Sequence, residues 1–171
     1  MDSKLAQKRH FPAINWLTSY SLYNRSLEGW YTKNAGDDWN DSIATAMSVL
    51  TEESKLQEIV QLVGSDALPE DQQLTLEVAR MLREFYLQQN AFHDVDTYCT
   101  IQNQYKFMSV VLHYKELAEK AMNSGIELDK VIGLPILEDI GRAKFEENMD
   151  ELLDKYDKTM ANDFAKLMEE A

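Results

Sequence analysis

Long apolar runs and cysteines are the two features that this sequence of 171 residues most clearly lacks. It holds no stretch of about 18 uninterrupted apolar residues, the length that a membrane-spanning helix requires, so we expect no direct membrane insertion. No apolar stretch follows the basic residues near its start, so we expect no secretory signal. The single cysteine, Cys99, cannot form an internal disulfide, which agrees with a reducing, cytoplasmic location.

The sequence also lacks the short motifs from which an autonomous active site could be predicted. No GxxxxGK[ST] phosphate loop occurs, and the six glycines are too scattered to form one. The cluster that most resembles a set of metal ligands consists of His93, Asp94, Asp96 and Cys99. Its spacing fits no CxxC, HExxH or calcium-loop template, so we predict no metal site and no catalytic residue. The spacing leaves open a reactive Cys99 paired with a histidine.

Negative charge dominates the composition, with 30 acidic residues against 17 Lys and Arg and a formal net charge of −13. Such a surface repels nucleic acid and anionic lipid headgroups, so we expect no nucleic-acid partner. Residues 56–79 contain several acidic side chains and no Lys or Arg. This acidic region is either an ordinary solvated face or a contact for a basic protein partner.

Helical periodicity runs through the sequence, without an alternating strand pattern or a tight hairpin signal. We predict an all-α fold, a bundle of about five or six helices with a protruding helix–turn–helix, forming a single domain over residues 1–171. Residues 1–14 are expected to be an extended lead-in segment, because Pro12 disfavours helical backbone angles at Phe11.

The most distinctive predicted element is a pair of helices joined by a short acidic turn. The first helix is expected over residues 39–63 and should end at Gly64, although Glu53 and Ser54 interrupt its apolar stripe and permit a bend or break. The second is expected over residues 69–89, with a proline at its first position and acidic residues in its first turn. The two helices and the turn GSDAL therefore predict the protruding helix–turn–helix, with an acidic tip.

Three other segments carry apolar side chains at helical spacing. The spacing over residues 16–30 predicts a helix that ends near Gly36. Another helix is expected over 101–122, and the clearest pattern, over 145–167, predicts a final helix. The segment 90–99 has no such pattern and is expected to be irregular.

Two long runs resemble the catalytic A subunits of V/A-type rotary ATPases. They are HFPAINWLTSYSLY at 10–23 and LQEIVQLVGSDALPEDQQLTLEVARMLREFYLQQNAFHDVDTYC at 56–99. The first resembles the segment that leaves the nucleotide-binding domain, and the second resembles the helical C-terminal domain. The resemblance implies a parent that hydrolyses or synthesises ATP, transports ions and lies peripheral to the membrane. It also implies that the phosphate loop and the Mg²⁺ ligands of the parent lie upstream, so this chain alone should be inactive.

The resemblance assigns three aromatic residues to the adenine of ATP or ADP. HFPAIN is similar to the aromatic-Pro-Ala motif IYPAVDP of the F-type beta subunit, which places Phe11 against the base. QQNAFHDVDTY is similar to QPFQVAEVF of that subunit, which places Phe92 and Tyr98 in the same pocket. Stacking of a base on an aromatic ring contributes about 1–3 kcal/mol, which makes this role physically reasonable. The alternative is that all three are ordinary core aromatics.

The resemblance also gives the acidic tip a partner, because it aligns with the DELSEED region that touches the rotating central stalk in this family. The residues implied in that contact are Asp66, Ala67, Leu68, Pro69, Glu70 and Asp71. Ala67 and Gln72 replace acidic residues of the F-type sequence, so we expect the shape of the tip to matter more than any single charge. The other implied partners are the B subunits.

Two alternatives remain compatible with composition and periodicity. One is a free-standing acidic helical adaptor that binds a basic protein, and the other is an independent thiol or metal enzyme. The adaptor is disfavoured by the aromatic residues of HFPAINW, which need a neighbouring domain to cover them. A phosphate loop encoded upstream of Met1 would favour the ATPase, whereas bound metal or a reactive Cys99 would favour the enzyme.

Overall fold

The computed structural model describes residues 1–169, and in that range all regular structure is helical. The prediction of an all-α bundle is therefore confirmed. The described residues form eight α-helices, more than the five or six expected, because the short helices Ser3–Gln7 and Ile136–Arg142 were not predicted. The helices are α1 Ser3–Gln7, α2 Asn24–Asn34, α3 Trp39–Val63, α4 Glu70–Met81, α5 Ile101–Asn123, α6 Leu128–Ile132, α7 Ile136–Arg142 and α8 Met149–Glu169.

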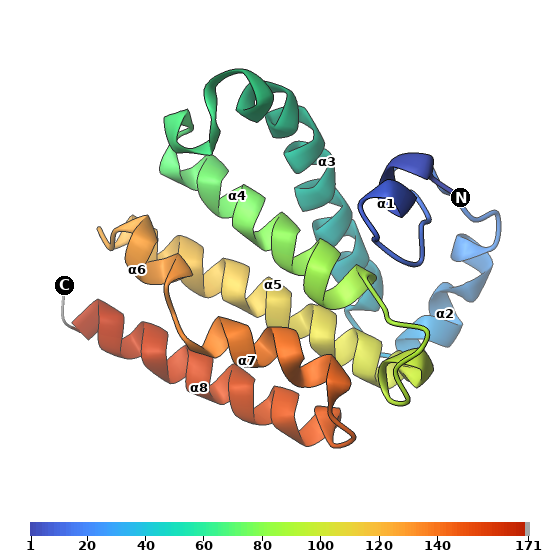
Figure 1. Ribbon diagram of the computed structural model, residues 1–171. Coiled ribbons are helices and arrows are strands. Elements are labelled where there is room, and N and C mark those ends of the chain that lie inside the picture. The colour runs from blue at the N-terminus through green and yellow to red at the C-terminus, as the bar shows by residue number, and fades with distance from the viewer. Residues whose placement is uncertain (170–171) are drawn as a thin grey trace.

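A long central helix, α5, organises the bundle (Figure 1). It packs along α8 on one side and against α3 and α4 on the other. Its inward side chains recur every three or four residues, as an amphipathic helix requires. The largest fully buried side chains of the core come from α4, α5, α7, α8 and the turn after α4: Tyr114, Phe107, Phe164, Met81, Leu82, Met108, Ile140, Leu153 and Met160.

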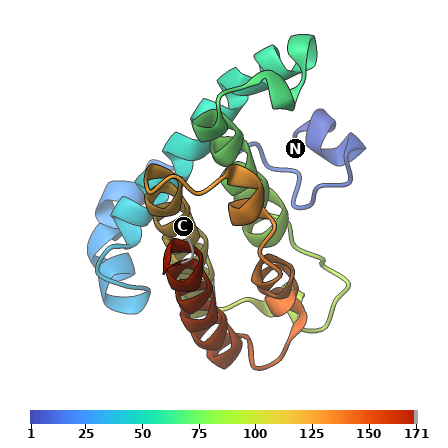
Figure 2. The ribbon, with the colours of Figure 1, turned by 90° about the vertical axis from the view of Figure 1, so that its left-hand side faces the viewer.

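Helices α3 and α4 form the expected helical hairpin, and their joining turn projects beyond the rest of the bundle. The two views agree, since the hairpin leads away from the layer of α5, α7 and α8 in both Figure 1 and Figure 2. A single turn, η1 Ser65–Ala67, lies at the tip. At the other end, α4 continues into a π-helical turn, η2 Leu82–Leu87, so the helical path extends almost as far as the predicted 69–89.

Helix α3 is continuous from Trp39 to Val63, so the break permitted at Glu53 does not occur. The carboxylate of Glu53 is buried and pairs with the guanidinium of Arg83, with 3.0 Å between Oε1 and Nη2. Glu53 lies on the buried face of α3 and has its charged partner on η2, so it belongs to the inward-facing stripe that the sequence pattern treated as interrupted. The ion pair joins the two arms of the hairpin near its base.

The N-terminal region differs from the prediction in two places. The lead-in segment 1–14 is not extended throughout, because Asp2 Oδ1 accepts hydrogen bonds from the backbone of Lys4 and Leu5 and caps α1. The helix expected over 16–36 begins only at α2. Upstream of it, Asn15 Oδ1 accepts hydrogen bonds from the next backbone N–H groups and holds a turn instead.

None of the helices in the described range is long and apolar enough to cross a membrane.

Candidate functional site

A cavity of about 840 Å³ opens where the lead-in segment meets the end of the helical hairpin. Its walls come from segments that are distant in sequence: residues 9–12, the end of η2, the loop 88–92 and the end of α7 with the following turn, η4 Ala143–Phe145. Four aromatic rings line it, together with four charged side chains, three amides and one hydroxyl. The aromatic members are Phe11, Phe85, Phe92 and Phe145.

Three hydrogen bonds hold the lead-in segment to the end of the hairpin. The backbone N–H of Gln89 donates to the carbonyl of Phe11 at 2.7 Å. The side-chain amide of Gln88 donates to the carbonyl of Arg9 at 3.4 Å. His10, which is buried, donates from Nε2 to the carbonyl of Arg83 at 2.8 Å. Phe11 is thereby fixed beside the loop that follows η2.

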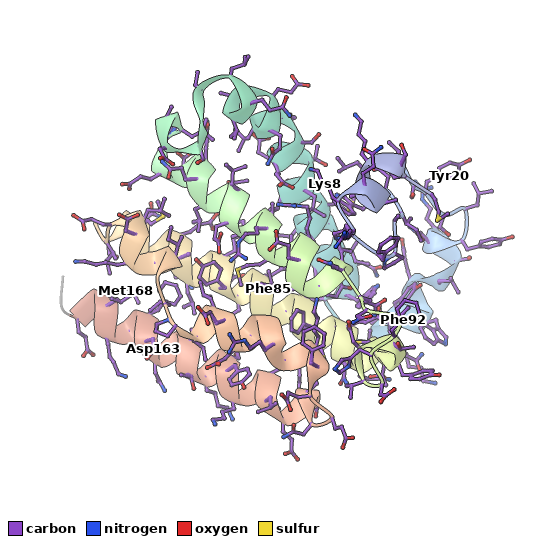
Figure 3. All side chains as sticks on the ribbon, viewed as in Figure 1. Lys8, Tyr20, Phe85, Phe92, Asp163 and Met168 are labelled. Atoms are coloured by element: carbon purple, nitrogen blue, oxygen red, sulfur yellow. The ribbon has the colours of Figure 1, made fainter. Side chains whose placement is uncertain are left out.

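The loop 88–92 is held by contacts to residues 96 and 97. Asp96 Oδ2 accepts a hydrogen bond from the backbone N–H of Asn90 at 2.6 Å, and Thr97 Oγ1 donates to the carbonyl of Asn90 at 3.1 Å. Asn90 Oδ1 in turn accepts from the backbone N–H of Phe92 at 3.0 Å. The result is an internally hydrogen-bonded loop that presents Phe92 with 97% of its surface exposed, away from the helical core (Figure 3).

Lys144 closes the inner end of the cavity. Its ammonium group donates to the carbonyls of Glu84 at 2.8 Å and Gln88 at 2.9 Å, so it caps the C-terminal end of η2. Burial lowers the pKa of this lysine, and the nearby carboxylates of Asp96 and Glu84 partly oppose that shift. The ammonium also lies 5.3 Å from the ring centre of Phe145.

The ring of Phe85 depends on the absence of a side chain at Gly141. A methyl group on Gly141 would lie 2.8 Å from Cε1 of Phe85, closer than real carbon contacts allow. We expect Gly141→Ala to displace Phe85 and to lower the free energy of unfolding by about 1–3 kcal/mol, as overpacked cores do. Urea unfolding measures this. The matched control is Gly29→Ala in α2, where a methyl group meets open space, and we expect it to stabilise by up to about 1 kcal/mol.

The tip of the helical hairpin has a different character. Gly64 ends α3 with a φ of 86°, a backbone angle that residues other than glycine rarely adopt. Leu68 is buried with 7% of its surface exposed, and its carbonyl accepts a hydrogen bond from the side chain of Gln73 at 2.8 Å. Glu70 and Asp71 stand in the first turn of α4, where negative charge is favourable. The tip is therefore a closed, internally bonded turn.

Exposed apolar side chains lie on the last turns of α3, which lead into the tip. Leu62 exposes 85% of its surface at the end of α3, and Ile59 and Val63 of the same helix are exposed as well. Leucine at that exposure carries apolar surface that another protein could cover. The tip thus combines an acidic turn with an apolar patch.

The family model for the C-terminal domain of V and A type ATP synthase matches residues 28–132, which is more than half of the chain. The chain belongs to this family.

Individual relatives agree with the assignment of the chain to a C-terminal domain of V and A type ATP synthase. The A subunit of the A-type ATP synthase of Methanopyrus kandleri is 50% identical over 100% of this chain, and that of Methanosarcina acetivorans is 50% identical over 98% of it. An A subunit of the A-type ATP synthase of Methanospirillum hungatei is 47% identical over 100% of the chain. The chain spans about 29% of the length of these relatives.

Two of the three residues predicted to contact adenine line the same cavity in this domain. Phe11, with 48% of its surface exposed, and Phe92 both belong to its walls. Tyr98, at the end of the 3₁₀ turn η3 Asp96–Tyr98, is 81% exposed and is not among the cavity-lining residues. None of the three is buried, so the alternative that they are ordinary core aromatics is wrong.

The cavity also contains residues that the sequence did not single out for it. Phe85 belongs to the apolar stripe of the hairpin, and Phe145 was assigned to the final helix, which begins only at Met149. Lys144 carried no motif signal at all. These residues come together only when the domain folds, so the spacing of residues in the sequence does not indicate that they share a cavity.

The residues that resembled metal ligands in the sequence have other roles in this domain. Within residues 1–169, no group of three His, Cys, Asp or Glu side chains is arranged to hold a metal ion. His93 packs its ring 4.9 Å from that of Phe145, and Asp96 ties the loop. Burial raises the pKa of the Cys99 thiol, which lowers its thiolate fraction and thus its reactivity.

Proposed function

We propose that this domain supplies part of the adenine pocket in the catalytic chain of an A-type ATP synthase. Phe11 and Phe92 stack on or against the base, while Tyr98 is a more peripheral contact in the same loop region. The phosphates and Mg²⁺ bind to the remainder of the catalytic chain. The observation that carries this proposal is that two exposed phenylalanines from distant segments line one cavity.

The chemistry of the cavity suits a purine. Its volume of about 840 Å³ is larger than a single base needs, so a neighbouring domain can share it. Exposed aromatic rings offer flat, poorly hydrated faces on which a base stacks for about 1–3 kcal/mol. A phenylalanine with 97% of its surface in solvent gains nothing from the fold of this domain, which supports an external partner for Phe92.

We further propose that the helical hairpin couples the state of the nucleotide to rotation of the central stalk, and thereby to ion transport. The end of η2, where the hairpin begins to form the cavity, is continuous with α4, which runs to the tip. The ion pair of Glu53 and Arg83 and the unbroken α3 stiffen this lever. The contact at the tip comprises Asp66, Ala67, Pro69, Glu70 and Asp71, with Leu68 supporting the turn from inside.

The apolar patch beside the tip is expected to matter more for torque than the acidic charges. Replacing Asp66 and Asp71 by Asn and Glu70 by Gln should lower torque only slightly, since exposed ion pairs contribute about 0–1 kcal/mol. Leu62→Ser should lower it more, because it removes apolar contact area. Single-molecule rotation of the assembled enzyme measures both, with the exposed neighbour substitution Gln61→Ser as control. Loss of rotation in the charge-neutralised enzyme would contradict this proposal.

In the parent enzyme, the B subunits and the central stalk are the proposed partners, in a complex that lies peripheral to the membrane on its cytoplasmic side. The chain by itself is proposed not to hydrolyse ATP, because stacking without phosphate contacts leaves most of the affinity for a nucleotide unused. A phosphate-release assay with ATP and Mg²⁺ is expected to show no turnover by the isolated chain. Steady release of phosphate would overturn this part of the proposal.

A further inference from the structure

Asp96 is a buried carboxylate on the wall of the cavity. Only 3% of its surface is exposed, yet it lines both the large cavity and a smaller one of about 200 Å³ that continues inward. The other buried carboxylate, that of Glu53, is neutralised by Arg83. In the described part of the chain, no cation lies within ion-pair distance of Asp96.

The hydrogen-bonding capacity of Asp96 is largely unused. Its Oδ2 accepts from the backbone N–H of Asn90, and this is the one hydrogen bond to the carboxylate among residues 1–169. A carboxylate can accept about four such bonds. The oxygen without a protein partner is reachable from the cavity rather than sealed in the core, so a ligand that brings N–H groups can bond to Asp96 there.

The nearest positive group does not satisfy this carboxylate. Lys144 lines the same two cavities, but its ammonium is directed to the carbonyls of Glu84 and Gln88. Lysine has three donors, and two are engaged in capping η2. Asp96 therefore remains an acceptor, and Lys144 a neighbouring donor, on the wall of a cavity that four phenylalanine rings also line.

We propose that Asp96 accepts a hydrogen bond from the exocyclic 6-amino group of the bound purine and so selects adenine over 6-oxo purines. This inference rests on the proposed adenine pocket and adds the residue that determines base specificity. Adenine carries an N–H donor at position 6, whereas hypoxanthine and guanine carry an oxygen acceptor there. A 6-oxo base in the same orientation places its oxygen against the carboxylate, where two acceptors repel, and its N1–H donor reaches Asp96 only after the base shifts, so the 6-oxo base is disfavoured.

The experiment compares ATP with ITP, whose base carries an oxygen in place of the 6-amino group and a proton on N1. The assembled enzyme, with its complete catalytic chain and partner subunits, is assayed for kcat/KM with each nucleotide. Purine riboside triphosphate, which lacks any exocyclic group, is the third substrate. We expect the native enzyme to prefer ATP by about tenfold or more over both analogues, the size of effect that a hydrogen bond to a charged group produces.

The variant Asp96→Asn tests the residue itself. Asparagine keeps an oxygen for the backbone N–H of Asn90 and adds an N–H₂ group that can donate to a 6-oxo base. We expect the preference for ATP over ITP to fall by about tenfold, with most of the change in KM. The matched control is Asp94→Asn, an exposed carboxylate two residues away that does not line the cavity.

The outcomes separate this inference from the proposed pocket. If Phe11→Ala and Phe92→Ala weaken ATP and ITP equally while Asp96→Asn leaves their ratio unchanged, the pocket stands and the role of Asp96 is wrong. If the phenylalanine variants change neither nucleotide, the pocket itself is wrong. If the native enzyme uses all three nucleotides alike, the inference is overturned. This comparison needs no variant, so it remains decisive even when the Asp96→Asn protein fails to fold.

Discussion

Replacing Phe11 and Phe92 together by alanine is expected to raise the KM for ATP of the assembled enzyme by about 10- to 100-fold. The range follows from the stacking free energy of about 1–3 kcal/mol per base, with each 1.4 kcal/mol equal to a factor of ten. The value of kcat should change little, because the rings bind the base in the ground state and the transition state alike. Steady-state kinetics with Mg²⁺ at saturation measures both constants.

Two tyrosines serve as comparisons for this double variant. Tyr20 is exposed and projects from the N-terminal region, distant from the loop that carries Phe92 (Figure 3), so Tyr20→Ala should leave the KM unchanged. Tyr98→Ala tests the third predicted contact, and because Tyr98 does not line the cavity we expect a smaller effect than for either phenylalanine. A double phenylalanine variant with the native KM for ATP would contradict the pocket.

Arg83→Met is expected to have the largest effect on stability, lowering the free energy of unfolding by about 3 kcal/mol or more. The substitution leaves the carboxylate of Glu53, whose side chain is only 8% exposed, buried without its cation. Removing one partner of a buried ion pair typically costs about 3–5 kcal/mol, because the remaining charge stays desolvated. Urea unfolding of the chain, followed by circular dichroism, measures the change. Methionine is chosen because it keeps most of the apolar length of arginine.

The double variant Arg83→Met with Glu53→Leu should recover most of that loss, because no uncompensated charge is left. The matched control is Arg142→Met, which breaks an exposed ion pair with Glu138 on α7 and should change stability by less than about 1 kcal/mol. Equal effects of Arg83→Met and Arg142→Met would show that the buried pair does not stabilise the hairpin.

Periodicity was sufficient to predict the fold where a helix has one continuous apolar face. The stripe along α5 predicted a helix that the structure has at Ile101–Asn123. It failed where side chains hydrogen-bond to their own backbone, as Asn15 does ahead of α2, because apolar spacing does not register that competition. It also failed at Glu53, since the sequence cannot show that Arg83 will face it across the hairpin.

The candidate site was predictable only through resemblance to a family. Phe11 and Phe92 are far apart in sequence, and no local pattern indicates that they line one cavity. Lys144 and Phe85 were missed because their roles arise from long-range packing, in which α7 meets the end of η2. Asp96 was noticed for the wrong reason, as part of a cluster resembling metal ligands, whereas its buried carboxylate faces the cavity.

The length of α3 sets the mechanical advantage of this domain. Its 25 residues, at about 1.5 Å each, make a rod about 37 Å long with no break along it. A tilt of about 10° about its Trp39 end would sweep the far end of such a rod through about 6 Å, roughly the length of one helical turn. Under the proposed coupling, a small hinge rotation of the hairpin therefore becomes a stroke at its tip long enough to pass one side chain of an opposing surface.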